Sequence, residues 1–341
     1  MDGRESDPQA DSVSKQPLEV AESSALQLQL RRMLTAGELE LPLPGGGATG
    51  DRLMKLCGIA RSDLEVARLA EAHIDAIAIL YEAGHCPQPH LLYGVWAAQD
   101  PSCRLELVDA PGADAAMALR GTKAFCTGST LLDHALVSVR TREGVLLIDV
   151  DLHDRRVSFD ESGWRTPAFS ATATAVTTFD DVAVSPASIV GSPGFYLDRI
   201  GFAHGACGPA ACWAGGALGL VDHAIAVVSR KNPNPHLDAY IGALSAQAWS
   251  LEALLHAAGQ QIDQQPNDRA TAMQRALMLR HRVERTATEV VDLHGRAVGP
   301  RALIHDENII RRIGQLQLYV RQHHDESDLE AIGAMCRINQ S

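Results

Sequence analysis

Hydrophobic residues follow a helical period at both ends of the chain and an alternating period in the middle. Apolar side chains recur every three to four positions over residues 25–34 and again over residues 62–83, where Ser62 is the predicted N-cap. Between residues 91 and 190 they alternate with polar ones, which is typical of strands that bury one face. Helical spacing then returns in four stretches, at residues 204–229, 237–262, 269–293 and 308–321.

This pattern predicts an α+β protein, with a helical domain, a small antiparallel β domain and a four-helix bundle in that order. The opening residues 1–22 are polar and lack an apolar core, so a disordered tail is expected there. The predicted domains then cover residues 23–92, 93–190 and 191–341.

The β domain is expected to contain seven strands separated by turns. Because no helices lie between them, and no Gly-x-Gly-x-x-Gly is present, a doubly wound nucleotide-binding sheet is not expected. The small residues 127–129 fall between the third and fourth strands and predict a hairpin turn there. The predicted strands are residues 91–97, 104–108, 119–126, 134–140, 144–149, 157–159 and 175–179.

Composition narrows the function classes. The chain has 341 residues, and 42 acidic against 30 basic residues give a net charge of −12, which argues against nucleic acid or an anionic membrane as partner. Seven cysteines without a Cys-x-x-Cys favour reduced thiols and a cytoplasmic location over disulfides or zinc. The apolar stretch 205–221 contains Pro209 and several glycines, so a buried bundle helix is expected rather than a membrane span. No metal site is expected, because the adjacent His323 and His324 would point a quarter-turn apart on a helix.

Candidate chemistry lies at the end of the third predicted strand. Phe125 is followed by Thr127, Gly128 and Ser129, whose hydroxyls and backbone N–H groups suit the edge of a flat polar ligand. An ordinary β-hairpin with a glycine turn explains the same residues equally well.

The sequence Gly-x-Lys-x-Phe-x-Thr-Gly-Ser, followed by Leu-Asp-His-Ala-Leu-Val, resembles the middle-domain signature of the acyl-CoA dehydrogenase family. The similarity continues through residues 168–194 and the helical C-terminal half. It implies that FAD is the cofactor and that Phe125, Thr127, Gly128 and Ser129 seat the flavin ring. By the same resemblance Trp96 would lie on the flavin side, although a core position is the alternative.

The resemblance also implies a second cofactor region. In the family a Gly-rich turn of the bundle binds the far end of a neighbouring subunit's FAD, and Asp292, Gly295 and Arg296 stand at that position here. Arg296 replaces the second glycine of the family's pair. Arg230 begins a family element whose Phe-Gly is missing, and Gln247 lies where the family often has a glutamine.

The catalytic base has several candidates. The family supplies a glutamate in a Tyr-Glu-Gly-Thr-like loop, and no such sequence is present. The corresponding position is followed by Gln-His-His-Asp-Glu, residues 322–326. The base is therefore Glu326 or Asp325 after a shift of a few residues, or else His323 or His324, because an imidazole titrates near neutrality.

Three functions remain open. The first is an FAD-dependent oxidoreductase that dehydrogenates an acyl thioester of coenzyme A or of a carrier protein, with an electron-transfer partner. The second is a flavin-dependent monooxygenase of the same fold, which needs no glutamate base. The third is a catalytically silent binding module. The resemblance also implies a homodimer or homotetramer, with the flavin between the β domain and the bundle and in contact with a second subunit.

Overall fold

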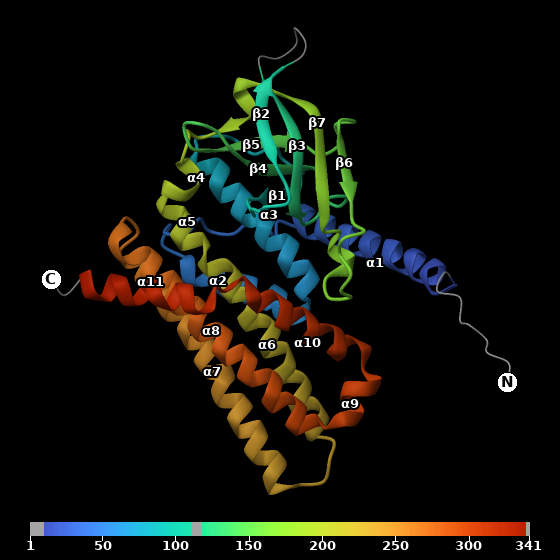
Figure 1. Cartoon of the computed structure of the whole chain (residues 1–341). Coiled ribbons are helices and arrows are strands. Elements are labelled where there is room, and N and C mark those ends of the chain that lie inside the picture. The colour runs from blue at the N-terminus through green and yellow to red at the C-terminus, as the bar shows by residue number, and fades with distance from the viewer. Residues whose placement is uncertain (1–9, 111–116, 339–341) are drawn as a thin grey trace.

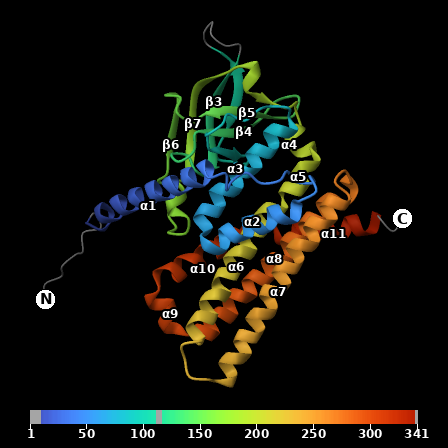
Figure 2. The same cartoon turned by 180° about the vertical axis from the view of Figure 1, so that it is seen from behind.

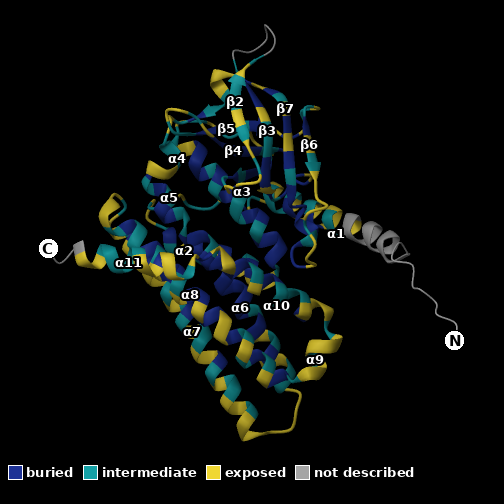
Figure 3. Ribbon diagram, in the orientation of Figure 1, coloured by how far each residue is buried: buried dark blue, intermediate teal, exposed yellow. Residues whose placement is uncertain are grey.

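The β domain lies at one end of the molecule and the helical bundle at the other (Figure 1). The structure, a computed structural model, describes residues 10–110 and 117–338. Seen from behind, the third helix runs from the β domain towards the bundle (Figure 2). A continuous hydrophobic core joins all three predicted parts, and the buried residues concentrate along the central helices (Figure 3).

The N-terminal part contains three helices, α1 (Ala10–Thr35), α2 (Thr49–Ser62) and α3 (Leu64–Glu82). The prediction of a disordered tail over residues 1–22 is wrong in part, because residues 10–22 belong to α1. Residues 1–9 lie outside the described residues. A helix anchored by the buried Leu26 and Leu30 can extend beyond the residues that pack.

Helix α2 was not predicted, and it changes the cap of the next helix. The glycine-rich turn at residues 45–50 leads directly into α2, whose last residue is Ser62. The N-cap of α3 is therefore Asp63 rather than Ser62, and the Asp63 carboxylate accepts from the N–H groups of Glu65 and Val66.

Two four-stranded sheets form the β domain, with strand orders β1-β4-β5-β8 and β2-β3-β7-β6. All pairs are antiparallel except β1 with β4, which is parallel. The strands are β1 (Tyr93–Trp96), β2 (Leu105–Asp109), β3 (Met117–Cys126), β4 (His134–Arg140), β5 (Val145–Asp151), β6 (Val157–Asp160), β7 (Ala175–Val184) and β8 (Ile189–Val190).

The predicted hairpin between β3 and β4 is wrong, because these strands belong to different sheets. Residues 127–133 instead carry the chain from one sheet to the other. The Gly128 and Ser129 N–H groups donate to Thr172 and Ala173 carbonyls, so the crossing is held by the chain that precedes β7. Periodicity identifies a strand but not its partner, which explains the error.

The bundle consists of four long helices, as predicted, together with shorter ones. The long helices are α6 (Cys207–Val228), α7 (Pro235–Gln264), α8 (Arg269–Val298) and α10 (Glu307–Tyr319). Three shorter helices are α4 (Phe195–Asp198), α5 (Ile200–Gly205) and α9 (Pro300–His305), and α11 (Asp325–Ile338), about as long as α10, follows the bundle. Three 3-10 turns complete the described structure: η1 (Ser170–Thr172), η2 (Pro186–Ser188) and η3 (Val320–Gln322).

One stretch among the described helices, Ile200–Val228, is long and apolar enough to suit a membrane span by length and composition alone. In the structure 61% of that apolar window is buried inside the protein. Its apolar surface therefore packs against α2, α3 and α8, which is the environment of a core helix.

His73 connects α3 to the β domain and makes the fold sensitive to acid. Its ring is buried, and its Nδ1 accepts the backbone N–H of Tyr93 at 3.1 Å. Burial lowers the pKa of His73 to about 4. Because the unfolded chain binds this proton near pH 6.5 and the folded chain does not, stability is full above pH ~6.5 and falls towards pH ~4.

We therefore expect the free energy of unfolding to fall by up to ~1.4 kcal/mol per pH unit from His73 alone over that window. Urea titrations of the native protein and of His73→Gln at pH 7 and pH 5 measure the effect. The variant should lose less stability on acidification than the native protein, and an equal loss would contradict the assignment.

Candidate active site

A cavity of about 440 Å³ lies where α3, α5, α6, α8 and the start of α11 meet, and it reaches the β domain at Val95. Its size is within the usual range for small-molecule sites, ~300–1,000 Å³. Apolar side chains line part of it, and the rest carries an unusual concentration of ionisable groups. These are Glu71, Asp75, Tyr196, Arg199, Arg280, His324 and Asp328.

Two of the other hollows are somewhat larger, and the first of them also carries ionisable groups, although Arg104, Glu106 and Arg140 there are exposed. The first lies within the β domain beside Lys123, whose ammonium donates to the Ala98 carbonyl and to both Ser138 oxygens. The other lies between α8 and α10 and is mainly apolar. The cavity at α3 is therefore the best-equipped site for chemistry.

Glycines in α5 and α6 make room for the carboxylates of α3. A Cβ atom at Gly208 would lie 2.8 Å from Glu71 Oε1, and one at Gly205 would lie 2.7 Å from Asp75 Oδ1. Glu71 and Asp75 are one helical turn apart and share a face of α3. Burial, followed by the Asp75 carboxylate, raises the pKa of Glu71 to about 8.

The two arginines of the cavity are already paired within the protein. Arg199, whose side chain is 3% exposed, places Nη1 3.1 Å from Glu82 Oε1 and Nη2 3.8 Å from Asp75 Oδ2. Arg280 donates to the carbonyls of Ala206 and Gln322 at 3.2 and 2.6 Å.

Arg280 also lies over the Trp213 ring, 4.7 Å from its centroid. Burial lowers the pKa of Arg280, so the ring and the two carbonyls are what hold this cation inside the protein. The guanidinium in turn fixes the end of η3 relative to α6 and α8.

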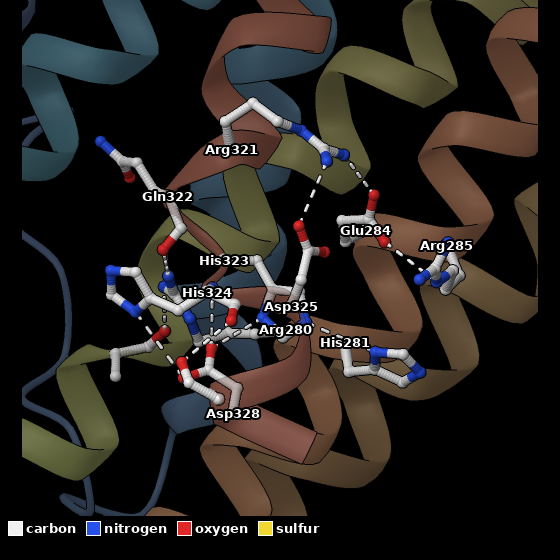
Figure 4. Close-up of polar contacts among 12 residues, drawn as sticks. Arg280, His281, Glu284, Arg285, Arg321, Gln322, His323, His324, Asp325 and Asp328 are labelled. Carbon is white, nitrogen blue, oxygen red and sulfur yellow. Dashed lines mark hydrogen bonds and ion pairs between the residues drawn. The ribbon is translucent and has the colours of Figure 1, made fainter. Parts of the chain in front are cut away.

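A chain of three side chains leads from the protein surface to the cavity (Figure 4). His281 Nδ1 lies 3.4 Å from His323 Nε2, and His323 Nδ1 lies 2.8 Å from Asp328 Oδ2. The His323 side chain is fully buried, whereas His281 is partly exposed and Asp328 lines the cavity. Because each imidazole can both accept and donate a proton, this arrangement can move protons between the cavity and solvent.

The sequence-predicted bases occupy different places. His323 is buried next to the cavity, and His324 lies at its mouth with a side chain that is 75% exposed. Asp325 forms an ion pair with Arg321 at 3.5 Å, and Glu326 is exposed. Neither Asp325 nor Glu326 lines the cavity.

Across the described residues, no three His, Cys, Asp or Glu side chains are arranged as metal ligands. The two histidines of the α10–α11 turn, His323 and His324, both lie next to the Asp328 carboxylate, and His323 also contacts His281 of α8.

The β domain presents an aromatic ring at the end of β3. Phe125 is 52% exposed, and its φ of +58° is a left-handed conformation that an aromatic residue rarely adopts. Such an outlier suggests function when the surrounding structure enforces it. Trp96 is buried and donates its indole N–H to the Thr127 carbonyl, so it supports the segment that follows Phe125.

Thr127 has a charged neighbour from α3. Arg68 Nη2 donates to Thr127 Oγ1 at 3.1 Å, and its guanidinium lies over the rings of Phe169 and Tyr319. Among the described residues, Thr127 is the hydrogen-bond partner found for Arg68, so four of its five N–H groups stay available. Gly128 and Ser129, in contrast, are buried and use their N–H groups inside the protein.

The second predicted cofactor region lies in the bundle, away from the β domain. Arg230 follows the end of α6 and is exposed, and Gln247 lies in the middle of α7. Arg296 pairs with Asp292 at 2.9 Å on an exposed face of α8, beside Gly295. Within one chain the structure does not bring these residues to Phe125 and Thr127 (Figure 1).

A flavin fits the first region better than the second. An exposed aromatic ring, a hydroxyl and a guanidinium with free N–H groups match the flat ring and carbonyl edge of an isoalloxazine. At the second region Arg296 is already paired, and it occupies the place where the family's glycine lets a dinucleotide approach the backbone.

Sequence reasoning missed Arg68 beside Thr127, and it missed four residues of the cavity, namely Glu71, Asp75, Arg199 and Asp328. A signal for the α3 residues was present. Acidic residues recur at 71, 75 and 82 on a mainly apolar helix, and glycines recur at 201, 205 and 208 on the helices that face it. Matching the two patterns required knowing that these helices are neighbours.

Comparison with known proteins identifies the fold. No protein-family model matches the sequence, and no curated protein matches it. Among solved structures, dibenzothiophene monooxygenase TdsC from Paenibacillus sp. A11-2 is similar, with 17% identity, 92% of this chain and 96% of that chain covered, and a TM-score of 0.73. KijD3, in a complex with FMN and a dTDP-linked amino sugar, has 15% identity, 94% and 92% coverage and a TM-score of 0.77.

Methanesulfinate monooxygenase MsuC from Pseudomonas fluorescens has 15% identity, 94% and 97% coverage and a TM-score of 0.72. The chain thus has the acyl-CoA dehydrogenase-like fold, as the sequence resemblance implied. At these identities the likeness establishes the architecture.

Proposed function

We propose that this chain is a flavin-dependent monooxygenase that uses FMN. The observation that carries the proposal is the His281–His323–Asp328 chain, which connects the cavity at α3 with the protein surface. The fold is shared with TdsC and MsuC, which are named as monooxygenases, and KijD3 was crystallised with FMN.

Reduced flavin, when bound, supplies two electrons with which one oxygen atom of O₂ is inserted into a substrate and the other leaves as water. In this proposal Phe125 packs against the ring, and Thr127 and Arg68 bind its carbonyl edge. The positive charge of Arg68 stabilises the extra electron density of the reduced ring. Asp328 and His323 hold and move a proton at the edge of the cavity.

Two features count against dehydrogenation of an acyl thioester. Asp325 and Glu326 lie outside the cavity, so neither can reach a substrate there. The charged lining would also have to be desolvated against an acyl chain, which is costly. The predicted electron-transfer partner becomes, in this proposal, a reductase that supplies reduced flavin. In this proposal a second subunit of a homodimer or homotetramer covers the bound flavin.

The test combines cofactor binding with oxygen labelling. We expect apoprotein to bind FMN at least about tenfold more tightly than FAD, because the second cofactor region lacks the open glycine pair. With photoreduced FMN and ¹⁸O₂, a panel of sulfides, indoles and amines should yield a product that carries one ¹⁸O atom.

Two outcomes would contradict this function. Anaerobic bleaching of bound flavin by an acyl thioester would select the dehydrogenase. A protein that binds neither FMN nor FAD in excess would select the silent binding module.

A further inference from the structure

Glu71 is the one cavity carboxylate that no hydrogen bond or ion pair reaches from any described residue. The Asp75 carboxylate lies 3.8 Å from Arg199, and Asp328 lies 2.8 Å from His323. Glu71 Oε1 instead packs towards the backbone of Gly208, in space that exists only because residue 208 has no side chain. Glu71 is half-buried and lines the cavity, so a ligand in the cavity can reach its carboxyl group.

Arg52, Arg280 and Arg68 act on the Glu71 carboxylate through their charge, but among the described residues none of them forms an ion pair or hydrogen bond with it. Arg199 directs Nη1 and Nη2 towards Glu82 and Asp75, and its Nε–H is buried without a hydrogen-bond partner among the described residues. Arg280 uses Nη1 and Nη2 on two backbone carbonyls. The η nitrogens of both guanidinium groups are thus engaged within the protein, whereas the Glu71 carboxyl group forms no hydrogen bond or ion pair with a described residue.

The ligand that fits this cavity has a positively charged hydrogen-bond donor and an apolar carbon skeleton. Val95, Phe202, Pro209, Met273 and Leu277 form the apolar part of the lining. An amine places its N–H groups on the polar side and its carbon skeleton against these residues. The raised pKa of Glu71, about 8, is near the range in which a carboxyl group exchanges protons with an amine at neutral pH.

We propose that the cavity takes a substrate with a basic amine and that Glu71 both binds its ammonium group and accepts its proton. In this step an N–H bond of the ammonium breaks, an O–H bond forms on the Glu71 carboxylate, and the nitrogen keeps the electron pair. The inference rests on the proposed function, because the freed lone pair makes the nitrogen a nucleophile for oxygen transfer.

Binding of three probes that share a benzyl group tests this on the full-length protein. Titration calorimetry with benzylamine, benzyl alcohol and phenylacetate compares a cation, a neutral molecule and an anion of similar size. We expect benzylamine to bind at least about tenfold more tightly than either of the others, in keeping with a charge-assisted hydrogen bond. Equal or tighter binding of benzyl alcohol or phenylacetate, or no benzylamine binding at about 10 mM, would overturn the proposal.

The matched variants are Glu71→Gln and Glu65→Gln. Glu65 lies on the same helix, is buried and has a pKa raised to about 7 by burial, but it faces Arg311 outside the cavity. We expect Glu71→Gln to weaken benzylamine binding at least about tenfold and Glu65→Gln to leave it within about twofold. An unchanged affinity in Glu71→Gln would contradict the role of this residue.

Thermal unfolding of both variants checks that they fold, and the three-probe comparison on the native protein decides the ligand class without them. The outcome is separable from that of the proposed function. If the protein selects amines but does not bind FMN, the proposed flavin function is wrong and the amine site stands. If it binds FMN but does not select amines, only this inference is wrong.

Discussion

Gly215→Ala lowers the melting temperature of the protein by several degrees, because it forces apart the central helices α2 and α6. A Cβ atom at residue 215 would lie 2.1 Å from the Cys57 carbonyl oxygen, 2.7 Å from Ala60 Cβ and 2.9 Å from the Arg61 nitrogen. Two of these are backbone atoms, so no side chain can rotate away. Overpacking of this kind costs ~3 kcal/mol or more.

Gly242→Ala is the matched control for this prediction. Residue 242 is an exposed interior position of α7 with no atom within 4 Å of an added Cβ. The same substitution there should raise stability by up to ~1 kcal/mol, since alanine is the better helix former. Differential scanning fluorimetry of both variants compares them directly. If Gly215→Ala melts at the native temperature, then α2 and α6 are not in the contact described.

The close crossing of α2 and α6 shows why the sequence predicts the bundle better than the N-terminal part. The run of alanines and glycines in residues 204–229 indicates close helix packing, and α6 lies there. The partner, α2, has a weaker signal, because its buried face includes the polar Thr49 and Arg52. Its helix is stabilised by packing against α6, which local sequence does not reveal.

The β domain could be predicted strand by strand but not as a whole. The strand at residues 134–140 has the same bounds in the structure, and the others agree within a few residues. Alternation specifies which face of a strand is buried, whereas pairing depends on contacts distant in the chain. For this reason the hairpin at residues 127–129 and the all-antiparallel sheet were wrong, and the parallel β1–β4 pair was missed.

The site residues that belong to a sequence motif could be predicted. Those that only the tertiary structure brings together were missed. Phe125 and Thr127 belong to a recognisable motif, and the structure finds the first exposed and the second beside Arg68. Glu71 and Asp75 belong to no motif. They line one cavity, and Asp75 meets Arg199, only because α3 crosses the glycines of α5 and α6. Their roles follow from burial and missing partners, which are properties of the fold.

His323→Gln should lower the rate of oxygenation by ~100-fold while leaving FMN affinity within about twofold. The imidazole is fully buried between His281 and Asp328, and it is the one group in the α10–α11 turn that contacts both. Glutamine fills a similar volume and forms hydrogen bonds, but it cannot take up and release a proton near neutral pH. The rate is measured with the substrate that incorporates ¹⁸O best, and the affinity by flavin fluorescence.

A purely structural role for His323 would give a different result. If the side chain only held η3 in place, glutamine would keep the contacts, and the solvent deuterium isotope effect would not change. A broken proton path makes proton transfer slower, so the isotope effect should rise as the rate falls. His305→Gln, on the exposed end of α9, is the matched control and should show the native rate and isotope effect. A His323→Gln protein that keeps more than about half of the native rate would exclude the relay and leave Asp328 to exchange its proton directly with the cavity.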